Sequence, residues 1–203
     1  MSEKKVSYYE NFIEIEKKLW SLLTDAVKER GSEFRTPVFI CGNEKDLDGR
    51  VVVLRKADQK NNFVQFHSDI RSSKIEKIKK NPNCSILFYG KKEKIQLRLK
   101  TKCEVNFNNE ITKESWEKTG HVSRKCYLVN NGPGTVSDKP TSGLNGKFDN
   151  FDFTKEESEE GYRNFSVIKC KIISIEWLYL AAKGHRRALI NFEGSKKFTW
   201  LVP

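Results

Sequence analysis

Long apolar runs are missing from this 203-residue sequence. No stretch approaches the roughly 20 apolar residues that a helix needs to cross a bilayer. No apolar segment of the secretory type follows the polar start MSEKK. These absences exclude an ordinary membrane-spanning helix, so we expect a cytoplasmic protein with no membrane partner.

Paired cysteines and metal-ligand spacings are also missing. The chain has five cysteines, an odd number, at positions 41, 84, 103, 126 and 170. Their spacing matches neither a disulfide framework nor a Cys/His metal pattern. We expect most of these thiols to be reduced and buried, and we expect no metal site.

Acidic residues are too few to balance the basic ones, which leaves a formal charge of +11. Such an excess can indicate a nucleic-acid or membrane-surface partner. The lysines are instead scattered through amphipathic patterns, and the chain shows no recognition helix, glycine-rich clamp or interleaved aromatic stripe. The sequence therefore favours solvated lysines, and nucleic acid is not an expected partner.

The sequence does contain many β-branched segments bounded by turn signals, which are typical of strands. Its length and 37% hydrophobic content suit one domain spanning residues 1–203. An amphipathic helix is expected at 8–28 and a helical and loop insertion at 108–150, with helices at 110–119 and 123–129. Barrel strands are expected within 36–107 and 164–203, at 36–41, 50–56, 63–68, 85–89, 95–107, 164–177, 188–192 and 197–201.

The run RVVVLR, from Arg50 to Arg55, is the most informative segment. An unbroken apolar run of this kind predicts a strand buried on both faces. It forms a plausible hairpin with 63–68, which would gather Arg50, Arg55, His67 and Ser68 at the strand ends.

A helix start is expected beside that hairpin. Ser68 or Asp69 is expected to cap a helix at about 70–80, which Asn81-Pro82 terminates. Free backbone amides at a helix start, joined by hydroxyl groups and the positive charge of Lys74, are typical of a phosphate site. The sequence thus predicts an anion site here.

With these motifs in place, the chain resembles the pyridoxamine 5'-phosphate oxidase-like family, whose members bind FMN on a split β-barrel. Each motif alone would be weak, but their order and spacing agree from about Arg50 to the last residue. The matching positions are Arg50, Arg55, His67-Ser68, Ser73-Lys74, Gln96, Trp177, Lys183, His185, Arg187 and Pro203.

The resemblance implies a mainly β protein with flanking helices, an antiparallel split β-barrel of the FMN-binding type. It also implies a homodimer with FMN at the subunit interface. The implied reaction is hydride transfer from a small amine or alcohol, phosphorylated or not, to FMN, which oxygen reoxidises. The implied cofactor contacts are Arg50, Val51, Leu54, Arg55, His67, Ser68, Ser73, Lys74, Gln96, Ser137, Trp177 and Arg187.

The resemblance further implies substrate contacts from Arg55, Arg124, Lys183 and His185, with His185 and Lys183 as catalytic residues. A neutral imidazole at His185 can accept a substrate proton near pH 7.

The chain departs from the family where the substrate phosphate is gripped. The family uses Tyr, Arg and Ser at four-residue spacing, and the best match here is Gly120, Arg124 and Leu128. Arg55 stands where the family has a lysine, and Lys183 stands where the family has an arginine. We therefore expect a different substrate, and a flavin- or tetrapyrrole-binding protein without pyridoxamine phosphate oxidase activity remains the alternative.

Each singled-out residue also has a purely structural interpretation. Arg50 and Arg55 are also compatible with strand-end ion pairs, and Lys74 with a solvated helix position. Strand aromatics are more often core than cofactor contacts, which applies to Trp177. Gln96 could pair across strands, and His185 could be an exposed turn residue.

Overall fold

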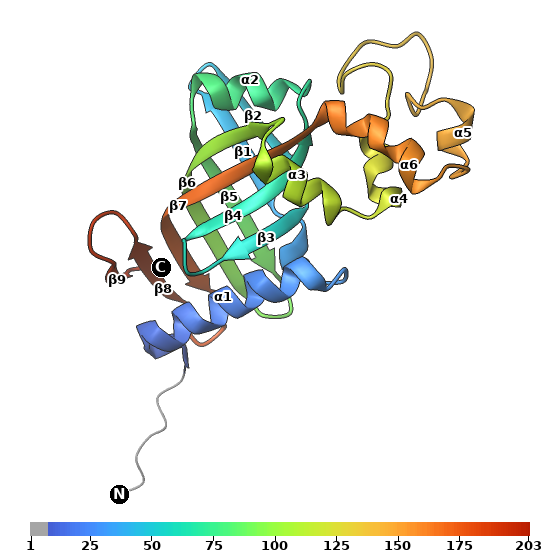
Figure 1. Cartoon of the computed structure of the whole chain (residues 1–203). Helices are drawn as coiled ribbons and strands as arrows, with labels where there is room; N and C mark the ends of the chain where they lie inside the picture. Colours follow the sequence, from blue (N-terminus) through green and yellow to red (C-terminus); the bar gives the residue numbers. More distant parts are fainter. Residues whose placement is uncertain (1–7) are drawn as a thin grey trace, which may run out of the picture.

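The computed structural model describes residues 8–203, and its strands form one antiparallel sheet (Figure 1). Along the sheet the strand order is β2-β1-β5-β6-β7-β4-β3, and β8 and β9 extend it from β7. The terminal strands β2 and β3 do not pair with each other, so the curled sheet is not closed. The strands are β1 (Val38–Asn43), β2 (Asp46–Val51), β3 (Leu54–Asp58), β4 (Phe63–Asp69), β5 (Asn83–Gly90), β6 (Ile95–Phe107), β7 (Phe165–Tyr179), β8 (Arg186–Asn191) and β9 (Lys197–Leu201).

Helices close the two ends of this curled sheet. Helix α1 (Phe12–Lys28) packs its apolar stripe on one end, and Asn11 caps it by accepting from the amides of Ile13 and Glu14. Helix α2 (Ser73–Lys80) covers the opposite end, as Figure 1 shows. The remaining helices belong to the insertion: α3 (Glu110–Glu117), α4 (His121–Arg124), α5 (Gly146–Asp149) and α6 (Lys155–Ser158).

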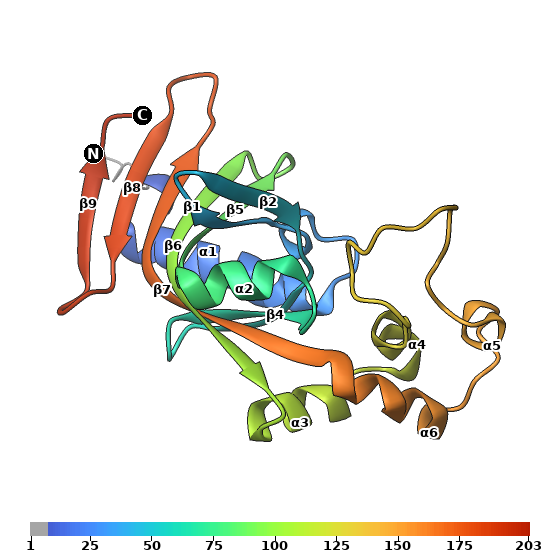
Figure 2. The same ribbon diagram turned by 90° about the horizontal axis from the view of Figure 1, so that it is seen from above.

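Alternation along the strands separates a core face from an outer face. On β5, Ile86 and Phe88 are buried, whereas Leu87 between them is only partly buried. The outer face of β1, β5, β8 and residues 176–178 of β7 is covered by no helix among residues 8–203 (Figure 2). Its partly exposed apolar residues are Val38, Ile40, Leu87, Leu178 and Leu189. At the start of β7, α3 covers the outer face, where Trp116 packs against Phe165 and Val167.

The run from Arg50 to Arg55 is not a single strand, so that prediction is wrong. The chain leaves β2 after Val51 and enters β3 at Leu54; β2 pairs with β1 and β3 pairs with β4. Val51 is 65% exposed whereas Leu54 is fully buried. Val52 lies in the connection between the two strands. Its amide donates to the carbonyl of Pro37, which precedes β1.

The predicted helix at 70–80 is shorter than expected. It begins at Ser73, and Ser72 is its N-cap, rather than Ser68 or Asp69. The Asp69 carboxylate accepts instead from the Arg71 amide, at 2.8 Å, which makes a tight turn before the helix.

The insertion is also more structured than predicted. The expected helix at 123–129 is replaced by α4 and a 3-10 turn over Lys125–Tyr127. The expected loop at 130–150 contains the short helix α5, and α6 follows it. No helix in residues 8–203 combines the length and apolar character that crossing a membrane requires.

The cysteines largely follow expectation. Four of the five are buried in the barrel core, and Cys126 alone is exposed. Within residues 8–203, no three His, Cys, Asp or Glu side chains come together as a metal site requires.

Candidate functional site

A cluster of hydroxyl and basic side chains lies where α2 begins. Arg50, near the end of β2, places its two terminal nitrogens 3.4 Å from Ser72 Oγ and 3.3 Å from Ser73 Oγ. The Lys74 ammonium lies 2.9 Å from Ser72 Oγ and 2.8 Å from the Oγ of Ser68, on β4. We call these five residues, Arg50, Ser68, Ser72, Ser73 and Lys74, the cradle.

The electrostatics of the cradle favour an anion. Burial, followed by the nearby Arg50 guanidinium, lowers the pKa of Lys74 to about 8. The Arg50 Nε atom is buried and has no hydrogen-bond partner among the described residues. Asp48 forms an ion pair with Arg50, but no carboxylate of residues 8–203 forms an ion pair with Lys74. A phosphate would supply negative charge to Lys74 and a hydrogen-bond acceptor to the Arg50 Nε atom.

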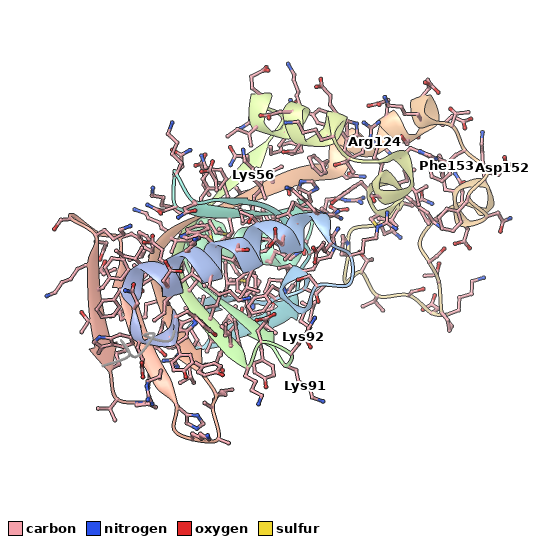
Figure 3. The ribbon with its side chains drawn as sticks, turned by 90° about the horizontal axis from the view of Figure 1, so that it is seen from below. Lys56, Lys91, Lys92, Arg124, Asp152 and Phe153 are labelled. Atoms are coloured by element: carbon pink, nitrogen blue, oxygen red, sulfur yellow. The ribbon has the colours of Figure 1, made fainter. Side chains whose placement is uncertain are left out.

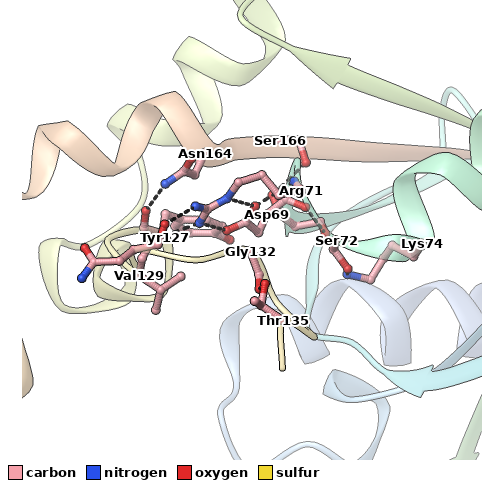
Figure 4. A network of polar contacts seen from close by, with 12 residues as sticks. Asp69, Arg71, Ser72, Lys74, Tyr127, Val129, Gly132, Thr135, Asn164 and Ser166 are labelled. Atoms are coloured by element: carbon pink, nitrogen blue, oxygen red, sulfur yellow. Dashed lines mark hydrogen bonds and ion pairs between the residues drawn. The ribbon is translucent and has the colours of Figure 1, made fainter. Parts of the chain in front are cut away.

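Arg71 also lies at this turn but points away from the cradle. Its guanidinium binds the Asp69 carboxylate and donates to the carbonyls of Val129 and Asn130, at 3.1 and 3.0 Å (Figure 4). Asn164 binds the carbonyl of Tyr127 in the same network, at 2.8 Å. The start of the long loop is therefore fixed beside the cradle.

A separate cleft of about 520 Å3 lies between the β3–β4 side of the sheet and helices α3 and α4. Arg55 and His67 both line it, so the structure separates Arg55 from Arg50. Burial, with a contribution from Arg55, lowers the pKa of His67 to about 3, so the imidazole is neutral at physiological pH. Arg55 Nε and His67 Nδ1 both lack hydrogen-bond partners among residues 8–203.

Basic side chains dominate the cleft. Five cations and two carboxylates line it, which gives a formal charge of +3 with His67 neutral. These charged residues are Arg35, Arg55, Lys56, Lys118, Lys169, Asp58 and Glu114. The cleft is thus suited to an anionic small molecule.

Arg124, predicted as a substrate contact, does not line this cleft. Its side chain is 1% exposed and donates to the carbonyls of Thr119 and Trp116, at 3.0 and 2.8 Å. It also forms an ion pair with Glu159. Figure 3 shows Arg124 on the insertion, and its role is to hold α3, α4 and α6 together.

The alignment of the phosphate grip changes accordingly. Of the predicted Gly120, Arg124 and Leu128, only Gly120 lines the cleft, and Leu128 is buried. Side chains at the same four-residue spacing do line it, but five residues earlier: Ser115, Thr119 and Ser123. Helix α3, the bend after it and α4 thus each place a small hydroxyl group, and no arginine, along this wall of the cleft.

Two predicted cofactor contacts lie in the core instead. Trp177 and Leu54 are fully buried, because each points to the inner face of the sheet. Gln96 and Arg187 occupy the outer face, where Leu178 of β7 lies between them in register. A ligand on the outer face therefore cannot reach the side chain of Trp177 without rearrangement.

The remaining predicted residues lie on the surface. Arg187 donates to Glu176 Oε1 at 3.0 Å, and Lys183 and His185 are exposed at the β7–β8 turn. This turn lies at the opposite end of the barrel from α2 in Figure 1. Ser137 is exposed on the long loop and donates to the carbonyl of Lys139. Within one chain, these residues do not meet the cradle.

Several cleft residues were missed from the sequence. Lys56, Gln65 and Lys169 lie side by side on β3, β4 and β7, and Arg35 follows α1. The alternation of polar and apolar residues within each strand indicates which side chains share a face. The pairing register of β3, β4 and β7, which brings the three side chains together, cannot be predicted from the sequence. Ser72, in the cradle, was expected among the donors of the anion site, but its place as the N-cap of α2 was not predicted.

The cradle lies at one end of a curled, unclosed antiparallel sheet. Residues 17–106 match the family model described as pyridoxamine 5'-phosphate oxidase, FMN-binding domain. The resemblance to this family is thereby confirmed. No curated protein sequence matches the chain.

Solved structures give the same answer for the fold. An FMN-binding, pyridoxamine 5'-phosphate oxidase-related protein of Nostoc punctiforme PCC 73102 has a TM-score of 0.74 at 16% identity, covering 92% of this chain and 96% of that one. PhzG of Burkholderia lata 383, solved with tetrahydrophenazine-1-carboxylic acid, has a TM-score of 0.71 at 14% identity, covering 99% and 98%. The predicted split-barrel fold is confirmed.

Proposed function

We propose that this protein is an FMN-dependent oxidoreductase in which the cradle holds the FMN phosphate. The observation that carries the proposal is the pairing of two cations, Arg50 and Lys74, with three serine hydroxyls at a helix start. The orphaned Arg50 Nε supports a missing acceptor at this point. The matched family model supports FMN as the phosphate-bearing ligand.

Each cradle residue then has a defined task. Lys74 would keep its proton on Nζ when a phosphate lies beside it, because an opposite charge favours the ammonium form. Arg50 would donate through its planar guanidinium, and the serines would orient the phosphate by hydrogen bonds. When bound, FMN would supply the redox chemistry, in which a small amine or alcohol, phosphorylated or not, is oxidised at the expense of oxygen.

The substrate side of the proposal is the cleft. Arg55 offers charge there, while His67 offers a neutral imidazole next to it. A neutral imidazole can donate a hydrogen bond from one ring nitrogen and accept one at the other without carrying net charge. A non-phosphorylated acid is included among the substrates, because the cleft wall carries Ser115 and Thr119 where the family has stronger anion partners.

We propose a homodimer, with the partner completing the site. The uncovered outer face carries apolar residues such as Val38 and Leu87, which favours burial against another surface. A C2 partner would bring its own β7–β8 turn toward the cradle of the first subunit. If the dimer forms in this way, Lys183 and His185 are the proposed catalytic residues. Gln96 and Arg187 are then the proposed flavin contacts.

The test compares FMN with riboflavin, which lacks the phosphate. Arg50→Met should weaken FMN binding by about 10- to 100-fold and leave riboflavin binding little changed, because charge-assisted hydrogen bonds to the phosphate are lost. The matched control Arg55→Met removes the same charge from the cleft and should preserve the preference for FMN over riboflavin. Fluorescence quenching of the flavin measures the six affinities, of the wild type and both variants for FMN and for riboflavin.

Two outcomes contradict the proposal. Absence of FMN binding to the wild-type protein removes the cofactor assignment, and an Arg50→Met variant with an unchanged FMN preference removes the cradle. The alternative function is flavin or tetrapyrrole binding without pyridoxamine 5'-phosphate oxidation, favoured by the absence of Arg124 from the cleft. Tight FMN binding with no oxygen uptake on pyridoxamine 5'-phosphate supports that alternative.

A further inference from the structure

Two lysines of the cleft flank one aromatic ring. Lys56 on β3 and Lys169 on β7 both lie opposite Gln65 of the intervening strand β4. Their Nζ atoms lie 5.2 and 4.6 Å from the centroid of the Phe63 ring. Figure 3 shows Lys56 between α1 and α3 in that view. We call Lys56, Phe63 and Lys169 the lysine pair site.

Two carboxylates, Asp58 and Glu114, lie near the lysine pair site. Asp58 accepts from the Asn61 amide at 2.9 Å and from its side chain at 3.0 Å. Against the effect of burial, these hydrogen bonds, followed by the charges of Lys56 and Lys169, lower the pKa of Asp58. Glu114 pairs with Lys118 at 2.6 Å. Within residues 8–203, neither Lys56 nor Lys169 forms an ion pair.

The lysine pair site therefore concentrates like charge. Two ammonium groups that share one ring repel each other, and a bound anion between them would remove that repulsion. The buried Phe63 ring adds a flat apolar surface, which an aromatic or conjugated ligand can contact. Arg35 and Arg55 supply a second, distinct group of cations in the same cleft.

We propose that the cleft binds a small planar molecule with two anionic groups, one facing Arg35 and Arg55 and the other held between Lys56 and Lys169 over Phe63. The inference rests on the proposed function in taking this molecule as the substrate of the flavin reaction. It names the substrate class as a planar dianion and assigns the lysine pair site as its specificity determinant.

The test uses benzoate and the three benzene dicarboxylates as probes, titrated by calorimetry into the full-length protein both with and without added FMN. At least one dicarboxylate should bind about tenfold or more tightly than benzoate, because only the dianion engages both groups of cations. The double variant K56A/K169A should lose this advantage and keep its benzoate affinity. The conservative variant K56R/K169R should restore the advantage, and Lys102→Ala, an exposed lysine on β6, serves as the matched control.

The outcomes separate the two proposals. Equal affinity for benzoate and all three dicarboxylates overturns the inference, as does an advantage that survives in K56A/K169A. Flavin binding is measured on the same samples. Intact FMN binding without a dicarboxylate advantage rejects only the lysine pair site, whereas a dicarboxylate advantage in a protein that binds no FMN rejects only the proposed function.

Discussion

The guanidinium of Arg124 lies over the indole ring of Trp116, with its central carbon 4.5 Å from the ring centroid. Both side chains are buried, and the Trp116 Nε1 atom donates to Glu159 at 2.6 Å, the same carboxylate that pairs with Arg124. The arginine thus joins three helical segments of the insertion through one carboxylate and one ring.

Arg124→Met is expected to destabilise the protein without weakening FMN binding. Methionine retains an apolar stem but leaves the carbonyls of Thr119 and Trp116 without a donor, which costs about 3 kcal/mol. Urea unfolding measures the change, and Lys113→Met, which breaks an exposed pair on α3, should change stability by less than about 1 kcal/mol. If Arg124→Met instead loses pyridoxal 5'-phosphate binding while its urea unfolding midpoint is unchanged, Arg124 is a substrate contact.

FMN affinity is expected to fall as the pH rises through about 8. The pKa of Lys74 is lowered to about 8 in the free protein, so above this pH the side chain must first take up a proton to bind phosphate. A fluorescence titration between pH 7 and 10 measures the decline. Lys74→Arg keeps its charge over this range and should abolish the decline, whereas an equal decline in the variant would assign it to another group.

Acid is expected to destabilise the protein through His67. Its pKa is lowered to about 3 from 6.5, so between these values the unfolded chain binds a proton that the folded protein does not. The contribution of His67 to the free energy of unfolding is fully present above pH 6.5. It declines by about 1.4 kcal/mol per pH unit as the pH falls below about 6. His67→Gln should flatten the urea-derived stability curve between pH 6 and 4, and the exposed His121→Gln should not. Parallel curves for wild type and His67→Gln would refute the buried neutral imidazole.

Leu87→Glu is expected to dissociate the proposed dimer. Leu87 lies on the outer face between Val38 and Arg98, so the new carboxylate can pair with Arg98 in the monomer but would be buried in an interface. Sedimentation velocity should show a dimer for the wild type and for Lys60→Glu, in the exposed β3–β4 turn, and a monomer for Leu87→Glu. A wild-type monomer that binds FMN tightly would remove the proposed interface.

The sequence was sufficient for the fold and for most of the cradle. Local signals placed Ser73 and Lys74 at a helix start, and the last strand, Lys197–Leu201, was predicted with its observed bounds. Such features depend on residues close together in the chain, where turn and capping preferences act.

The cleft could not be predicted in the same way. Lys56 and Lys169 are 113 positions apart and meet only through the register of β3, β4 and β7. The position of Arg124 outside the cleft has a related cause, since a four-residue spacing fits more than one start along the segment that contains α3 and α4. Trp177 was ambiguous because strand alternation gives two faces, and only packing decides which one is inside.

Strand β4 has one further property. Ser68 points toward Lys74 in the cradle, while the preceding His67 points into the cleft. Because successive residues of a strand face opposite sides, a slip of β4 by one residue would remove both groups from their places. In one direction His67 would replace Ser68 at the cradle and Phe66 would enter the cleft, and in the other Asp69 would bring a carboxylate to the cradle. The seven aligned pairs between β4 and β7 prevent either slip, so the division of labour between anchoring and chemistry is encoded in strand register.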